Sequence, residues 1–193
     1  MAPPDSRAPA CWSAAFDIRR PLAQDLCTRL SPLECTRAID GAARHRGIEA
    51  SYQQRAGAWT TQLSGLWLQA KREGATDPAA NGLRPVNVPS SSLRASLGYD
   101  FAVLPGLSLL AYGTREGGRA VLPDNSITVP AWTRLDLAAR YRTVMGGYPT
   151  VWQVGIDNLA DHRAWREAPY QFSHVYLFPM APRTWRASVQ TAF

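Results

Sequence analysis

Apolar and polar residues occupy alternate positions along most of this chain. From Leu93 to Phe101 the odd-numbered residues are apolar, whereas the even-numbered ones are polar or glycine. Similar alternation runs through 134–141 and 48–53. Because successive side chains of a strand point to opposite faces of a sheet, each segment predicts a strand with one apolar and one polar face. Helical periodicity is scarce, so the sequence predicts an all-β fold.

Turn-forming residues divide the chain into eight expected strands. These cover residues 12–20, 44–55, 58–71, 91–103, 106–116, 130–142, 149–158 and 182–193. Their lengths of about 9–14 residues exceed the mode of roughly 5–6 for soluble proteins and suit tilted membrane-spanning strands. The longest apolar stretch, Phe101 to Gly113, is interrupted by Pro105, so no transmembrane helix is expected.

The expected connections alternate between long and short. The long ones are 21–43, 72–90, 117–129 and 159–181, and the short ones are 56–57, 104–105 and 143–148. Outer-membrane barrels have long extracellular loops at one end and short periplasmic turns at the other, whereas a soluble sandwich has no reason to sort its connections. The pattern therefore favours an antiparallel transmembrane β-barrel.

Aromatic residues recur near the ends of these strands. Such positions suit the lipid–water boundary, where an amphipathic ring keeps its polar tip hydrated. Ordinary core packing is the alternative. The residues are Trp12, Trp59, Tyr99, Phe101, Tyr112, Trp132, Tyr141, Tyr148 and Trp152.

The final strand resembles the C-terminal signal by which the barrel-assembly machinery recognises outer-membrane proteins. Alternation places five residues on one face and ends the chain on an aromatic residue. They are Trp185, Ala187, Val189, Thr191 and Phe193.

Four further segments are similar, in order and spacing, to the closing part of TonB-dependent siderophore receptors. They are Arg46–Glu49, Gly82–Pro89, Asn125–Asp136 and Asp157–Asp161, the last lying near Trp165. The resemblance covers residues 12–193 and implies about eight strands at the C-terminal end of a 22-stranded plugged barrel. No segment resembles the plug or the TonB-contacting segment. Residues 1–11 lack a secretory signal, so we expect a non-native, disordered start and a natural N-terminus upstream.

The resemblance implies a TonB-dependent receptor of the cell outer membrane, with a ferric siderophore as its possible cargo. Its implied partners are outer-membrane lipid, lipopolysaccharide and the barrel-assembly machinery, with TonB engaged only through the missing N-terminal region. Two alternatives remain. One is a complete small eight-stranded barrel with a structural, adhesive or lipid-directed role, and the other is a soluble β-sandwich or lipocalin-like carrier.

Charge and motifs argue against nucleic-acid binding and catalysis, which agrees with the binding and transport role that the resemblance implies. The formal net charge is +6, but the arginines are dispersed without a basic run, so nucleic acid is not an expected partner. No catalytic motif, phosphate-binding loop or metal-ligand spacing of the three cysteines is visible. We therefore expect no enzyme, no metal site and no cofactor.

The candidate ligand-binding residues lie in the last long connection. Aromatic rings there could stack on a siderophore, although solvated loop residues are an equal alternative. They are Trp165, Tyr170, Phe172, His174 and Tyr176. His45 and Glu49 are expected to be polar residues of the barrel lumen. The topology also puts Cys27 and Cys35 in one outer loop, so we expect a disulfide between them and an unpaired Cys11.

Overall fold

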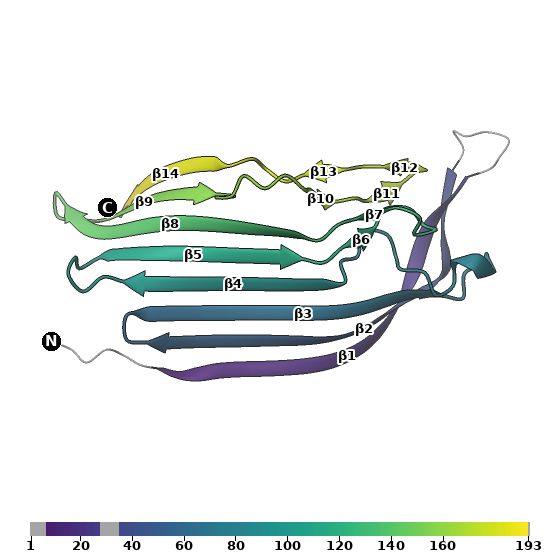
Figure 1. Ribbon diagram of the computed structural model, residues 1–193, viewed down its shortest axis with the longest axis horizontal. Coiled ribbons are helices and arrows are strands. Elements are labelled where there is room, and N and C mark those ends of the chain that lie inside the picture. Colours follow the sequence, from purple (N-terminus) through teal and green to yellow (C-terminus); the bar gives the residue numbers. More distant parts are fainter. Residues whose placement is uncertain (1–6, 28–34, 193) are drawn as a thin grey trace.

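The computed structural model describes residues 7–27 and 35–192, and its main feature is one antiparallel sheet of eight long strands (Figure 1). The strands follow one another across the sheet in chain order. They are β1 (Arg7–Cys27), β2 (Cys35–Ala56), β3 (Trp59–Glu73), β4 (Ser91–Asp100), β5 (Leu107–Glu116), β8 (Trp132–Met145), β9 (Tyr148–Asp157) and β14 (Thr184–Thr191). Each overlaps an expected strand, which confirms the all-β antiparallel prediction.

Shorter elements occupy the long connections. They are the 3₁₀ turn η1 (Pro78–Ala80) and the strands β6 (Arg119–Ala120), β7 (Thr128–Val129), β10 (Trp165–Glu167), β11 (Tyr170–Gln171), β12 (His174–Val175) and β13 (Phe178–Pro179). The small strands pair as β6 with β7, β10 with β13 and β11 with β12. The part of the chain that the structure describes holds no helix long and apolar enough to cross a membrane.

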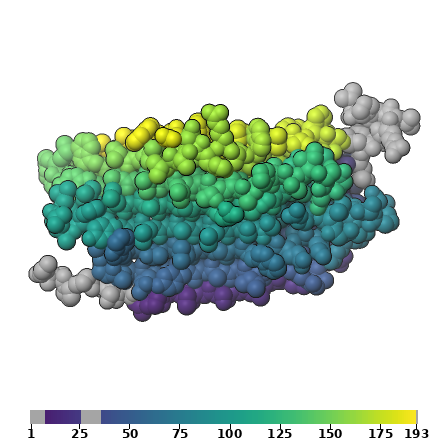
Figure 2. All heavy atoms as spheres, viewed as in Figure 1, coloured from purple at the N-terminus to yellow at the C-terminus, as the bar shows by residue number. Residues whose placement is uncertain are grey.

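The connections are sorted between the two ends of the sheet, as expected. The short turns β2–β3, β4–β5 and β8–β9 lie at the end where β1 begins and β14 ends, and the long connections lie at the opposite end (Figure 1). Figure 2 shows the strands as one continuous layer whose colours follow the sequence from one edge to the other. We call the end with the long connections the loop end.

The prediction of a long connection over residues 21–43 is wrong for most of that range. β1 continues to Cys27 and β2 begins at Cys35, with a bulge between Pro21 and Ala23. Polar pairs across the two strands replace apolar alternation here. For example, Gln24 donates a hydrogen bond to Asp40 (Nε2–Oδ2, 2.9 Å). β1 also begins at Arg7, so residues 7–11, expected to be disordered, belong to the sheet, whereas residues 1–6 lie outside the described part.

The strand register separates an apolar face from a polar face. Residues directly opposite each other share a face, and one such row crosses five strands as Leu97, Ala111, Leu137, Ile156 and Trp185. The exposed side chains of this row are apolar. A row on the other face runs through Ser51, Ser64, Arg94, Thr114 and Arg134. The two-faced strands predicted from alternation are therefore present.

The aromatic residues expected at strand ends divide between the two faces. Trp59, Tyr99 and Trp152 lie on the apolar face, and the rings of Trp59 and Tyr99 are 4.6 Å apart. Trp12 lies opposite Ser51, Tyr112 opposite Ser96 and Trp132 opposite Glu116, all on the polar face. These last three were wrongly assigned to the lipid boundary, because nearness to a strand end does not fix the side-chain parity.

The last strand presents four of the five residues of the predicted insertion signal on one face. Trp185, Ala187, Val189 and Thr191 lie opposite Ile156, Val154, Trp152 and Thr150 of β9. Trp185 is 76% exposed. Phe193 lies outside the described residues.

The sheet is open between its first and last strands. Among the described residues β1 pairs only with β2, and β14 pairs only with β9. The alternative of a closed eight-stranded barrel requires β1 to pair with β14, so this structure contradicts it. Unpaired edges of this kind belong to a larger barrel or to an association of chains.

Candidate ligand-binding surface

The polar face of the sheet carries hydroxyl, amide and guanidinium groups. Arg134 forms an ion pair with Asp136 (Nη2–Oδ2, 2.9 Å), and Arg186 forms one with Asp157 (Nη2–Oδ1, 3.1 Å). Other basic side chains of this face make no hydrogen bond or ion pair within the described residues. They include Arg20, Arg94, Arg140 and Arg142. A wall with surplus positive charge attracts anions.

A hollow of about 420 Å³ lies between β2 and β5, with its polar lining from the polar face. Arg94 and Tyr112 contribute to it, and Ser96 donates a weak hydrogen bond to Gln62 at 3.5 Å (Oγ–Oε1). A concave surface with a small number of well-placed polar groups is typical of a ligand-binding site. Sequence reasoning missed this site, although the even-numbered polar residues of 91–103 mark part of it.

Asn87 joins three of the long connections at the loop end. Its Oδ1 accepts hydrogen bonds from the backbone nitrogen of Ala168 (2.8 Å) and from Arg119 Nη1 (3.2 Å). Its own backbone nitrogen donates to the Ala120 carbonyl at 2.9 Å. Beside it, Val121, Val129 and Ala168 form a small buried core. The connections are therefore packed against one another rather than independent.

Asn158 fixes the start of the last connection. It is only 1% exposed, and its Nδ2 donates to the carbonyls of His162 (3.0 Å) and Ala181 (2.9 Å). Its Oδ1 accepts from the His162 nitrogen at 2.9 Å, and its backbone nitrogen donates to Asp136 Oδ1 at 2.7 Å. The segment Asp157–Asp161 therefore holds both ends of the connection to the sheet.

The structure brings together four of the five aromatic-loop candidates. Tyr170 and His174 lie in the β11–β12 hairpin, Phe172 lies in its turn, and Tyr176 follows directly, donating from its nitrogen to the Pro169 carbonyl at 2.9 Å. Phe172 is 49% exposed and Tyr176 is 47% exposed. Their rings are thus available to a ligand at the loop end.

This hairpin is attached to the first strand. The backbone nitrogen of Phe172 donates to Asp25 Oδ2 at 2.6 Å, and Arg37 Nη1 lies 3.5 Å from Asp25 Oδ1. Trp165, the fifth candidate, lies apart in the β10–β13 pair, opposite Pro179. It lines a different hollow of about 590 Å³, together with His162 and Met180.

The other titratable groups form no metal site within the described residues. His45 and Glu49 share the polar face of β2, as predicted, opposite Ala70 and Leu66 of β3. In the loop 121–127, Ser126 donates to Asp124 from its nitrogen (3.0 Å) and its hydroxyl (2.7 Å). These bonds, the backbone one first, lower the pKa of Asp124.

Comparison with known proteins identifies relatives of one kind. Residues 14–159 match the family described as TonB dependent receptor-like, beta-barrel. The ferrichrome receptor FcuA of Yersinia enterocolitica is 30% identical over 181 residues, which is 93% of this chain and 23% of that receptor.

Solved structures agree with this match. The ferric preacinetobactin receptor BauA of Acinetobacter baumannii superposes with a TM-score of 0.78 at 26% identity, over 95% of this chain and 27% of that one. The ferric yersiniabactin uptake receptor FyuA of Yersinia pestis has a TM-score of 0.75 at 17% identity, over 96% and 28%. The chain thus spans about a quarter of the length of the relatives it matches.

Proposed function

Because this chain belongs to the family of TonB-dependent receptor β-barrels, we propose that it forms the C-terminal part of the wall of an outer-membrane receptor that takes up a ferric siderophore. The cell outer membrane is the location of the siderophore receptors it matches. The observation that carries the proposal is the two-faced sheet, with an apolar face for lipid and a basic, polar face for a lumen.

Cargo recognition in this proposal uses two surfaces. The exposed rings of the β11–β12 hairpin stack on the siderophore at the loop end, and the free guanidinium of Arg94 attracts a negatively charged complex within the lumen. The relatives named above are receptors for ferrichrome and ferric preacinetobactin, and iron enters here as cargo rather than as a resident cofactor. The proposed role is binding and transport without catalysis.

The proposed partners follow from the same placement. Outer-membrane lipid and lipopolysaccharide surround the apolar face, and the barrel-assembly machinery recognises β14. TonB binds a part of the receptor that lies outside these strands. The loop end faces the medium, so a single cysteine at Ala79 reacts with an impermeant reagent on intact cells, whereas one at Leu104 does not. The reverse labelling pattern would overturn this orientation.

Uptake measurements test the proposed function. The natural full-length polypeptide is expressed in a receptor-deficient, iron-starved strain, and iron-55 uptake is measured for ferrichrome and ferric preacinetobactin with and without TonB. We expect TonB-dependent uptake of a ferric siderophore, and at least a several-fold loss when Phe172 and Tyr176 are both changed to alanine. Uptake that does not depend on TonB, or the absence of uptake for every ferric siderophore tested, would refute the proposal.

A further inference from the structure

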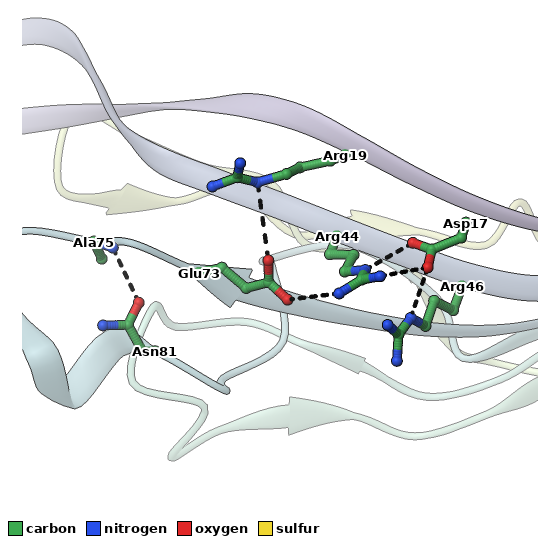
Figure 3. A network of polar contacts seen from close by, with 7 residues as sticks. All are labelled: Asp17, Arg19, Arg44, Arg46, Glu73, Ala75 and Asn81. Carbon is green, nitrogen blue, oxygen red and sulfur yellow. Dashed lines mark hydrogen bonds and ion pairs between the residues drawn. The ribbon is translucent and has the colours of Figure 1, made fainter.

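Six charged side chains gather on the apolar face of the sheet, where β1, β2 and β3 approach the loop end. Figure 3 shows all of them except Lys71. They share this face with Ile48 and Trp67, which lie opposite each other on the side of the cluster nearer the short turns. We call this group the charged cluster. Its members are Asp17, Arg19, Arg44, Arg46, Lys71 and Glu73.

Asp17 lies at the centre of the charged cluster and orients two arginines. Arg44 donates to both of its oxygens, from Nε to Oδ1 at 2.8 Å and from Nη2 to Oδ2 at 2.6 Å. Arg46 donates from Nε to Oδ2 at 3.0 Å. One carboxylate therefore holds two guanidinium groups side by side (Figure 3).

The remaining carboxylate is held more loosely. Glu73 lies 3.9 Å from both Arg19 Nε and Arg44 Nη1. Lys71, opposite Arg44 in the register, makes no hydrogen bond or ion pair among the described residues. The four cationic and two anionic groups leave an excess of two positive charges. The side chains of Arg19 and Arg46 are 67% and 53% exposed, so their outer nitrogens remain open to a ligand.

The depth of the charged cluster matches the outer border of a bilayer. On β3 the apolar face begins at Trp59 and continues to Trp67, and Gln69 and Lys71 follow. The ten residue steps from Trp59 to Gln69 rise roughly 25 Å for a strand tilted by about 40°, which is close to the height of the apolar band of such barrels. The charges thus begin where hydrocarbon ends, at the loop end.

We propose that the charged cluster binds the phosphate groups of lipopolysaccharide in the outer leaflet. Paired guanidinium groups match phosphate oxygens in charge and geometry, and Lys71 adds a further point charge. Acyl chains of the same glycolipid lie against the neighbouring Ile48 and Trp67. The assignment rests on the proposed function only for the orientation of the loop end, because that end faces the leaflet that holds lipopolysaccharide.

A binding measurement tests this inference without any transport step. The natural full-length polypeptide, purified in detergent, is titrated with fluorescent lipopolysaccharide, with its dephosphorylated form and with phosphatidylglycerol. We expect the triple variant R44Q/R46Q/K71Q to bind intact lipopolysaccharide at least tenfold more weakly, since each basic group near a phosphate layer is worth about fivefold. Phosphatidylglycerol, with a single phosphate, should bind less tightly than lipopolysaccharide.

Matched variants separate binding from folding. Lys71→Gln leaves no carboxylate unpaired and should weaken binding by itself, whereas Glu73→Gln removes a competing anion and should strengthen it. Arg84→Gln makes the same charge change in an exposed loop and should leave binding unchanged. Heat-modifiable mobility on gels checks that each barrel is folded. Equal affinity for the dephosphorylated form, or a folded triple variant that binds as tightly as the natural protein, would overturn the proposal.

Discussion

At the residue scale, buried polar groups decide how the long connections are attached to the sheet. Asn158 uses both the oxygen and the nitrogen of its side-chain amide, each partner is a backbone group, and the residue is only 1% exposed. A buried group that loses its partner costs about 1–3 kcal/mol. This makes the asparagine more important for stability than its small size suggests.

We predict that Asn158→Ala lowers the free energy of unfolding by about 2–4 kcal/mol, because two carbonyls and one N–H lose their partner. Urea titration of the full-length protein in detergent measures the change, and limited proteolysis reports loosening of residues 159–183. Asn81→Ala is the control, since exposed Asn81 accepts one hydrogen bond from the Ala75 nitrogen at 3.0 Å and should cost less than about 1 kcal/mol (Figure 3). Equal effects of the two substitutions would show that the amide network is not stabilising.

The backbone register makes the Cys27–Cys35 disulfide a sharper prediction. The two residues are directly opposite each other in the β1–β2 pair, although their side chains lie outside the described part of the chain. Opposite residues of antiparallel strands have Cα atoms about 4.5–5.5 Å apart, which is within the range that a disulfide spans. Oxidation outside the cytoplasm should therefore join them, and Cys11, which is exposed and free, should remain a thiol.

A peptide map of non-reduced protein checks this pairing. We expect one peptide pair linked through Cys27 and Cys35, and an alkylated Cys11. The bond closes a short loop and should add about 2–3 kcal/mol of stability. Finding both cysteines alkylated in protein isolated from the outer membrane would show that the disulfide does not form.

At the element scale, the parity of a side chain along its strand determines its environment. Leu137 lies in the middle of the apolar row, between Ala111 and Ile156. Gln153, opposite Arg140 on the neighbouring strand, points to the polar face. These two positions allow the same substitution to be compared in lipid and in the lumen.

We predict that Leu137→Arg destabilises the folded barrel by roughly 2–4 kcal/mol, because it places a charge against hydrocarbon. Gln153→Arg should cost less than about 1 kcal/mol, because the polar face is hydrated and already carries unpaired arginines. Folding into lipid vesicles, followed by urea titration, measures both. A larger cost for the Gln153 variant would mean that the two faces are assigned the wrong way round.

Alternation predicted the eight strands because it needs only local information. Segments such as 91–100 and 132–141 show their two faces in a few consecutive residues. The outer halves of β1 and β2 were missed because Pro21 and a bulge interrupt the period, and cross-strand polar pairs such as Gln24 with Asp40 stabilise them instead. The lipid-boundary prediction was also wrong for Trp12, Tyr112 and Trp132, because a position near a strand end does not determine which face of the sheet a ring occupies.

The candidate site was predictable only in its composition. The aromatic residues of 170–176 stand close together in the sequence, so their proximity is local. The hydrogen bond between Asp25 and Phe172 joins residues 147 positions apart, and the strands β10 and β13 are too short to show any period. Contacts of this kind depend on the packing of the long connections, which no local pattern encodes.

At the scale of the whole molecule, the open edges of the sheet decide what these 193 residues can do alone. Within the described residues, β1 and β14 each present one edge without a partner strand. Each backbone group left unpaired in hydrocarbon costs several kcal/mol, so both edges need further strands or another chain. Closing the sheet on itself at eight strands would fill the interior with side chains and leave no passage for a siderophore.

We therefore predict that residues 1–193, exported with an added signal peptide, give no TonB-dependent uptake. The test uses a receptor-deficient, iron-starved strain, with the natural full-length polypeptide as the positive control. The isolated segment should also be recovered as aggregates or as protease-sensitive protein, because its edges associate instead of pairing within one barrel. Disulfide trapping between single cysteines placed in β1 and β14 reports whether the segment closes prematurely. Uptake of any ferric siderophore by the isolated segment would mean that these eight strands suffice to make a passage. It would contradict both the expected association of the unpaired edges and the expected filling of an eight-stranded interior by side chains.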